Sequence, residues 1–122
     1  MDLRTGIDLI EIGRIEEVMR RHGARYLERI YTPAELEQSH QRADYLSGRF
    51  AAKEAVAKAL GTGIGEVAWK EIEVLGDEQN APILKLTGAA RQKADTLGLS
   101  LWSVSITHSA GNALALAVAI KP

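Results

Sequence analysis

Cysteine is absent from the 122-residue sequence, which excludes disulfides, thiolate metal sites and thiol nucleophiles together. Long apolar runs are also missing: no stretch of about 18 apolar residues could span a bilayer. The N-terminal segment does not resemble a signal peptide, because Asp2, Arg4 and Asp8 interrupt it before any apolar region develops. We therefore expect a cytoplasmic protein.

A strong charge of either sign is missing as well. The formal net charge is −1 at pH 7, so there is no global argument for binding nucleic acid or a membrane surface. The length suits one domain over residues 1–122, with a core that buries about two thirds of the unfolded surface. No internal repeat is visible, so a site that needs two copies of this unit would be built between subunits.

An acid and a base lie four residues apart within residues 48–60, which have a helical pattern. A helix turns about 100° per residue, so Glu54 and Lys58 share one side, where they could hold a metal ion and a phosphate. Lys53 points about 100° away from Glu54 and is not placed in that site. The alternative is an ordinary solvated helix pair, which contributes about 0.2–0.5 kcal/mol.

Asp8 is a carboxylate within residues 3–10, which otherwise read as an apolar strand. A charge in such a place is rarely buried without a partner or a cation. Asp8 and Glu54 together would suit a hard ion such as Mg²⁺, which keeps several waters and takes further ligands from substrate phosphates. A solvated strand end, or a salt bridge to Arg4 or Lys58, is the competing explanation.

The remaining pattern predicts an α+β fold with an antiparallel sheet and packed helices. We expect helices over residues 13–22, 43–60 and 88–97, with a further helix that starts at a capping box formed by Thr32 and Glu35. Strands are expected at residues 3–10, 72–75 and 83–87, followed by a C-terminal hairpin of residues 99–107 and 113–120.

The last strand alternates small and large apolar residues. Four alanines fall on one face, at positions 113, 115, 117 and 119, and Leu114, Leu116, Val118 and Ile120 fall on the other. Two apolar faces predict cover on both sides. A neighbouring subunit or an intramolecular helix could cover the alanines.

Five sequence motifs occur in an order typical of a known family. They are Gly-Ile-Asp-Leu at 6–9, Arg-Ile-Tyr-Thr-Pro-Ala-Glu-Leu at 29–36, Gly-Arg-Phe-Ala-Ala-Lys-Glu-Ala at 48–55, Gly-Thr-Gly-Ile-Gly at 61–65 and Ser-Val-Ser-Ile-Thr-His-Ser at 103–109. Together they resemble the 4′-phosphopantetheinyl transferase superfamily, specifically the short holo-acyl-carrier-protein synthases. The resemblance spans nearly the whole chain.

The resemblance implies an activity and a catalytic set. Such enzymes transfer 4′-phosphopantetheine from coenzyme A to a serine of an apo acyl carrier protein and release adenosine 3′,5′-bisphosphate. Asp8 and Glu54 would hold Mg²⁺, and Lys58 would add a second positive centre at the leaving group. Glu54, directly or through a metal-bound water, is the first candidate for the base that accepts the serine proton.

The resemblance also implies residues that bind coenzyme A. His108 and Thr107 would bind a phosphate, Arg49 would assist at the ribose phosphate, and the loop that starts at Gly61 would border the pantetheine arm or the phosphates. The residues alone allow simpler interpretations. A histidine at a turn is usually structural or exposed, and a glycine loop after a helix usually ends that helix.

A basic segment suggests a partner surface. Residues 12–31 hold five arginines and three glutamates, and Arg14, Arg21 and Arg25 approximate one face around Val18. Acyl carrier proteins resemble small acidic helical bundles, so this face would steer one toward the site; a solvated charged helix is the alternative. The resemblance further implies a homotrimer with active sites between subunits, with which the alanine face is compatible.

Two other classes of function remain open from the sequence. A metal-dependent hydrolase of nucleotides or pyrophosphates could use Asp8, Glu54 and Lys58 and pass the group to water. A non-catalytic assembly module would use the apolar strand to form a trimer and the charged helix to dock a partner. Neither class accounts for the ordered set of motifs.

Overall fold

The computed structural model describes residues 1–122. In chain order the elements are β1 (Asp2–Glu11), α1 (Ile12–His22), α2 (Ala24–Ile30), α3 (Pro33–Ser39), α4 (Ala43–Leu60), the 3₁₀ turn η1 (Trp69–Glu71), β2 (Ile72–Gly76), β3 (Pro82–Leu86), α5 (Gly88–Leu97), β4 (Leu101–Ser109) and β5 (Asn112–Lys121). No helix is both long enough and apolar enough to cross a membrane.

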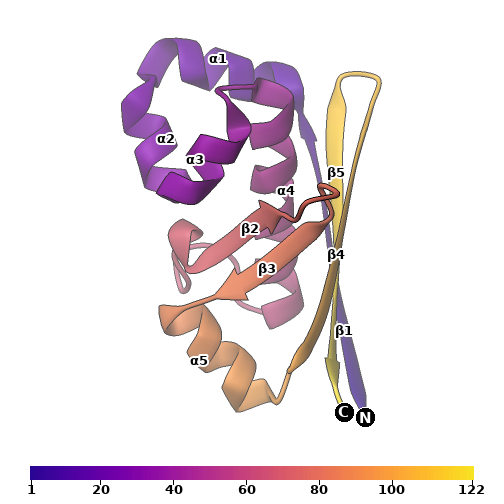
Figure 1. Ribbon diagram of the computed structural model, residues 1–122. Coiled ribbons are helices and arrows are strands. Elements are labelled where there is room, and N and C mark those ends of the chain that lie inside the picture. The colour runs from indigo at the N-terminus through magenta and orange to yellow at the C-terminus, as the bar shows by residue number, and fades with distance from the viewer.

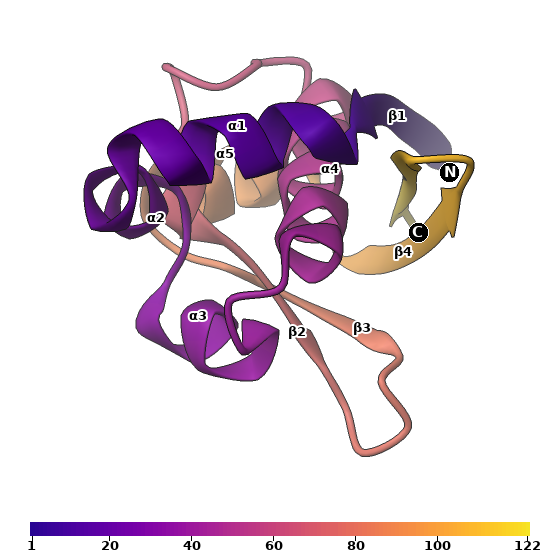
Figure 2. The same ribbon diagram turned by 90° about the horizontal axis from the view of Figure 1, so that it is seen from above.

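The strands form two separate antiparallel sheets. The long strands pair in the order β1-β5-β4, and β2 pairs only with β3. Helix α4 lies between the long sheet and the β2–β3 hairpin, with α1, α2 and α3 gathered at one end and α5 at the other (Figure 1). Seen from above, the hairpin projects away from α4 (Figure 2). The predicted α+β class is confirmed.

Most of the predicted elements are present, with shifts at their ends. The capping box is confirmed: the Thr32 hydroxyl accepts from the Glu35 amide, and the Glu35 carboxylate accepts from the Thr32 amide. The predicted hairpin turn is also present, with Ala110 and Gly111 at positive φ. Helix α2 was not predicted. Gly23, at φ 51°, ends α1 and starts α2 directly, so the basic segment is two short helices.

The alanine face of β5 packs on α4 within the same chain. All four alanines are fully buried, and the register places Gly6 of β1 opposite Ala117 and Asp8 opposite Ala115. A Cβ atom at Gly6 would overlap the carbonyl oxygen of Ala55, so only glycine allows this approach. Of the two possible covers for the alanines, the intramolecular helix is therefore the one present. The alanine face is therefore not available for a contact between subunits.

The opposite face of the long sheet is open and apolar. Leu3, Ile7 and Leu9 of β1 are more than half exposed, and Leu101 and Leu116 extend the same face across β4 and β5. These five residues are called the open face below. Large exposed apolar patches of this kind are typical of surfaces that meet another protein.

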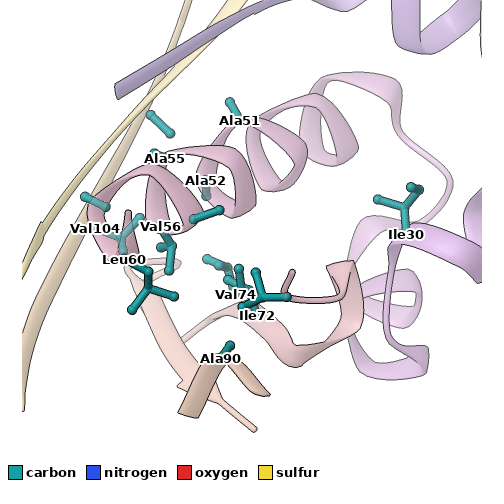
Figure 3. Close-up of a cluster of buried hydrophobic side chains, with 14 of the residues drawn as sticks. Ile30, Ala51, Ala52, Ala55, Val56, Leu60, Ile72, Val74, Ala90 and Val104 are labelled. Atoms are coloured by element: carbon teal, nitrogen blue, oxygen red, sulfur yellow. The ribbon is translucent and has the colours of Figure 1, made fainter. Parts of the chain in front are cut away.

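Helix α4 is covered on nearly every side, which accounts for its mixed sequence. Ala51 and Ala55 point to the long strands, while Val56 and Leu60 point toward Ile72, Val74 and Ala90 (Figure 3). These residues belong to one cluster of 23 buried apolar residues. Arg49, Lys53 and Ser47 of the same helix are buried too. The buried residues of this helix therefore extend well beyond one apolar stripe.

We predict that Gly6→Ala lowers the free energy of unfolding by about 1–3 kcal/mol, because α4 must retreat from β1 to make room for a methyl group. Chemical denaturation measures the effect. The matched control is Gly13→Ala in α1, where an added Cβ meets no atom within 4 Å and alanine favours the helix. A Gly6→Ala protein as stable as the control variant would contradict the packing described for α4.

Candidate active site

Asp8, Glu54 and Lys58 converge where β1 crosses α4. Asp8 lies two residues after Gly6 on the face of β1 that meets the helix, and its side chain is 18% exposed. The Lys58 ammonium donates to Asp8 Oδ1 at 3.2 Å and to the Ile7 carbonyl oxygen at 2.8 Å. Arg4 lies 4.0 Å from Asp2 and is not the partner of Asp8. The sequence-predicted trio is thus assembled within one chain.

The pKa of Glu54 is shifted by its burial and by the opposite charges of Asp8 and Lys58. Burial raises the pKa of Glu54, and the nearby Asp8 carboxylate raises it further, while Lys58 acts in the opposite direction. Two carboxylates that repel each other are stabilised by a cation between them. Lys58 supplies part of that positive charge by pairing with Asp8.

The residues present fit a magnesium ion. Asp8 and Glu54 offer hard oxygen donors, and their repulsion is the electrostatic condition that a divalent cation relieves. Nowhere in the chain are three or more histidine, aspartate or glutamate side chains placed so that they could hold a metal ion by themselves. Two protein carboxylates leave the remaining positions to water and to substrate oxygens, which is the usual arrangement for Mg²⁺ at phosphate-transfer sites.

Arg49 lies on a different side of α4 from Glu54. Five residues separate them, a rotation of about 140° around the helix axis. The Arg49 guanidinium is stacked 4.0 Å over the ring of Tyr45, and its Nε donates to the Val74 carbonyl oxygen at 3.2 Å. One Nη atom is buried without a hydrogen-bond partner. Burial lowers the pKa of Arg49.

His108 and Thr107 leave β4 on opposite faces. His108 pairs with Ala113 on the α4 side, where its Nε2 lies 2.8 Å from the Asp44 carbonyl oxygen and close to Gly48. Thr107 pairs with Leu114 and points to the other side of the sheet, the side on which the open face lies. Within one chain, the two side chains therefore do not meet at a single phosphate.

Gly61 ends α4 in a left-handed conformation, at φ 77°, with its amide hydrogen-bonded to carbonyls in the last turn. It follows Lys58 by less than one helical turn. The loop that it starts therefore begins next to the Asp8, Glu54 and Lys58 group, although at the helix end that repels phosphate.

The predicted partner residues are exposed but divided between two helices. Arg14 and Arg21 are seven residues apart on α1 and share one side, whereas Arg25 belongs to α2. Arg21 lies 3.1 Å from Glu17. Beside Arg25 is a hollow of about 630 Å³, lined by His22, Arg25, Tyr26, Arg29, Ile30, Phe50 and Trp69. Sequence reasoning missed this hollow, because its walls come from α1, α2, α4 and η1.

A second charged group that sequence reasoning missed lies behind α4. Lys53 and Glu35 are fully buried and 2.8 Å apart. Burial lowers the pKa of Lys53, and Glu35 opposes that shift. The sequence analysis correctly placed Lys53 outside the site of Glu54. The only sign in the sequence that Lys53 is buried is that its neighbours in the helix are mostly apolar. Nothing in the sequence identified Glu35 as its partner.

The raised pKa of Glu54 predicts a pH-dependent cost to stability. The folded chain holds this proton more tightly than the unfolded chain, so stability falls as pH rises from the ordinary glutamate pKa of about 4.3 through the raised value. Above that window the Glu54 carboxylate opposes folding. We expect Glu54→Gln to unfold at a higher urea concentration than the wild type at about pH 8, with the difference gone near pH 4.

Urea titrations without divalent cations, at both pH values, measure this difference. Glu78→Gln, in the exposed β2–β3 loop, is the control and should match the wild type at both. If Glu54→Gln were less stable than the wild type at the higher pH, burial and the repulsion from Asp8 would not outweigh the attraction of Lys58.

Comparisons with known proteins agree with the geometry. The family model described as the 4′-phosphopantetheinyl transferase superfamily matches residues 4–119. The holo-[acyl-carrier-protein] synthase of Herpetosiphon aurantiacus is 50% identical over 95% of this chain and 97% of its own length. That of Natranaerobius thermophilus is 43% identical over 97% of both.

A solved structure shares the fold. The crystal structure of the Helicobacter pylori holo-[acyl-carrier-protein] synthase in complex with coenzyme A superposes with a TM-score of 0.87 at 36% identity. The match covers 95% of this chain and 99% of that one. By sequence over almost its full length and by its fold, this chain belongs to the 4′-phosphopantetheinyl transferase superfamily.

Proposed function

We propose that this protein is a holo-[acyl-carrier-protein] synthase, which transfers 4′-phosphopantetheine from coenzyme A to a serine hydroxyl of an apo acyl carrier protein. The observation that carries the proposal is the convergence of Asp8, Glu54 and Lys58, in a chain whose relatives bear that name over nearly their full length. The cytoplasmic location stays a prediction.

The chemistry is a displacement at phosphorus. The serine oxygen forms a bond to the phosphorus that carries the pantetheine, and the bond from that phosphorus to the oxygen of the other phosphate breaks, releasing adenosine 3′,5′-bisphosphate. Glu54 is the proposed acceptor of the serine proton, either directly or through a water molecule.

Asp8 and Glu54 are the residues that would hold Mg²⁺. When bound, the ion supplies positive charge that offsets the charge on the diphosphate and its leaving group. Lys58 is placed to contribute a second positive charge, since its ammonium already lies at the Asp8 carboxylate on an exposed part of the helix. All three groups come from one chain.

Arg49, His108, Thr107 and the loop at Gly61 are proposed to bind coenzyme A. The partnerless Nη of Arg49 is a buried donor suited to a phosphate oxygen. His108 and Thr107 point to different sides of β4, and Arg49 lies around the helix from Glu54. This division favours a binding site completed by a second copy of the chain, with one copy supplying Asp8 and Glu54 and the other supplying the nucleotide contacts.

The open face is the proposed contact between copies in a homotrimer. Its five large apolar residues are exposed in the single chain, and Thr107 opens onto the same side of the sheet. Packing this face against neighbours removes apolar area from water and brings Thr107 to a subunit boundary. The face of larger side chains, and not the alanine face, thus takes the role that the sequence had suggested for β5.

The trimer is tested with Leu116→Glu, which places a charge at the centre of the open face. Sedimentation equilibrium should give the mass of three chains for the wild type and of one chain for the variant, with transfer activity lost. Thr96→Glu, on the exposed side of α5, is the matched control and should remain trimeric. A wild-type chain that sediments as a monomer would remove the trimer from the proposal.

The exposed arginines of α1 and α2 are proposed to dock the carrier protein. Arg14 has no acidic side chain within salt-bridge distance, so its charge is available to an acidic partner. The neighbouring hollow adds Arg25 and Arg29 beside the rings of Tyr26 and Phe50. Positive charge around an aromatic depression suits a small acidic helical bundle that also exposes apolar side chains.

Arg14→Glu tests this surface. We expect the Michaelis constant for the carrier protein to rise by about tenfold, while that for coenzyme A stays the same, because only the carrier approaches this helix. Arg91→Glu, on α5, makes the same change in net charge and should alter neither constant. Equal effects of Arg14→Glu on both substrates would place Arg14 outside the docking surface.

Intact mass spectrometry tests the function itself. A carrier protein incubated with this chain, coenzyme A and Mg²⁺ should gain about 340 Da, the phosphopantetheine increment, and a chelator should prevent the gain. Glu54→Gln should remain folded and nearly inactive. Cleavage of coenzyme A without modification of the carrier would favour the hydrolase. Absence of coenzyme A binding would leave the assembly module.

A further inference from the structure

We propose that the buried ion pair of Lys53 and Glu35 positions Glu54 against Asp8, and so sets the affinity of the cation site without touching the cation or the substrate. The inference rests on the proposed function, in which Asp8 and Glu54 are the cation ligands. Lys53 precedes Glu54 directly on α4 but points to the opposite layer of the molecule, toward β2 and η1.

Lys53 is held by a complete set of acceptors. Its ammonium donates to Glu35 Oε1 at 2.8 Å, to the Trp69 carbonyl oxygen at 3.1 Å and to the Ile72 carbonyl oxygen at 2.6 Å. A lysine ammonium has three hydrogens, so each one has a partner. The side chain is also fully buried. Its position is therefore fixed both by the directions of its three hydrogen bonds and by the packing around it.

Glu35 connects this arrangement to the start of α3 and to β2. Its Oε1 also accepts from the Thr32 amide, at 2.9 Å, and its Oε2 accepts from the Val74 amide, at 2.8 Å. Four elements thus meet at one ion pair: α3, α4, η1 and β2. Lys53 is the only residue of α4 that joins all of these elements by hydrogen bonds; Arg49 adds one bond, to the Val74 carbonyl oxygen, and Val56 and Leu60 add apolar packing on the same side.

The other side of α4 meets the long sheet mainly through alanines and Gly6, which let the backbones approach but have short side chains or none. The hydrogen bonds on that side come from the exposed Lys58, to Ile7 and Asp8, and from His108, to the Asp44 carbonyl oxygen at the start of the helix. The ion pair adds buried hydrogen bonds, which have preferred directions, next to Glu54 in the middle of the helix. Two apolar side chains could fill the same space with a lower desolvation cost. Apolar packing has no preferred direction, however, so it would fix the orientation of the helix less well.

Glu54 lies between these two attachments in the sequence. Lys53, on one side, is tied to the ion pair, and Ala55, on the other, has its carbonyl group against Gly6. A rotation of α4 would carry the Glu54 carboxylate away from Asp8, which is set on β1 and does not turn with the helix. Lys53 is therefore one of the contacts that set the separation of the two ligands, and it is the one next to Glu54 in the sequence.

Binding of Mn²⁺, followed by electron paramagnetic resonance on the full-length protein without substrates, tests this role. We expect Lys53→Met to weaken Mn²⁺ binding by about tenfold or more, as is typical when a group that orients a metal ligand is removed. Val56→Ala is the matched control: it also alters a fully buried side chain of α4, so it should lower the melting temperature but leave Mn²⁺ affinity unchanged. Equal weakening in both variants would reduce Lys53 to general support of the fold.

A second variant keeps the test decisive if the unpaired Glu35 charge prevents folding of Lys53→Met. The double variant Lys53→Met/Glu35→Gln contains no unpaired buried charge, so it should fold, and it should still bind Mn²⁺ weakly. Wild-type affinity in either folded variant would overturn the positioning role while leaving the proposed function intact. A wild-type protein that binds no Mn²⁺ would instead overturn the cation site, and the positioning role with it.

Discussion

The close contact between α4 and β1 at Gly6 is the constraint on which the rest of the structure depends. A single methyl group at this position would overlap the carbonyl oxygen of Ala55. Because the strand and the helix approach so closely, the alanines of β5 are enough to complete the interface. Small residues bury little apolar area each, so much of the cohesion of α4 comes from its other side, where Val56 and Leu60 meet the layer of β2 and α5.

This contact also explains where the chemistry is located. Asp8 follows Gly6 by two residues on the same strand face, and Glu54 precedes the Ala55 carbonyl, so the tightest point of the fold brings two carboxylates together. The burial of Glu54 and its repulsion from Asp8 are unfavourable for the charged form of Glu54 unless a positive charge offsets them. The fold thus holds a costly pair of charges in place, as is common where a protein binds a cation or a phosphate.

The sequence predicted the components of the site better than their arrangement. Asp8, Glu54 and Lys58 could be identified because an acid in an apolar strand and an acid-base pair at helical spacing are local signals. The ion pair between Lys53 and Glu35 left no such signal, since its partners lie eighteen residues apart on separate helices. The hollow beside Arg25 escaped for the same reason, because its walls come from four elements. The break at Gly23 escaped because the basic segment continues across it.

By itself, the sequence determined the α+β class, the strands of the C-terminal hairpin, the capping box at Thr32 and the residues that resemble the family motifs. These features depend on periodicity, turn chemistry and short spacings, which act within a few residues of each other. Only the tertiary structure decided that the alanines of β5 face α4 and that larger apolar side chains form the open face. It also decided that His108 and Thr107 point to opposite sides of the long sheet. The strand has two apolar faces, so its alternation could not say which one the chain would cover, and that choice was made by a helix more than fifty residues away.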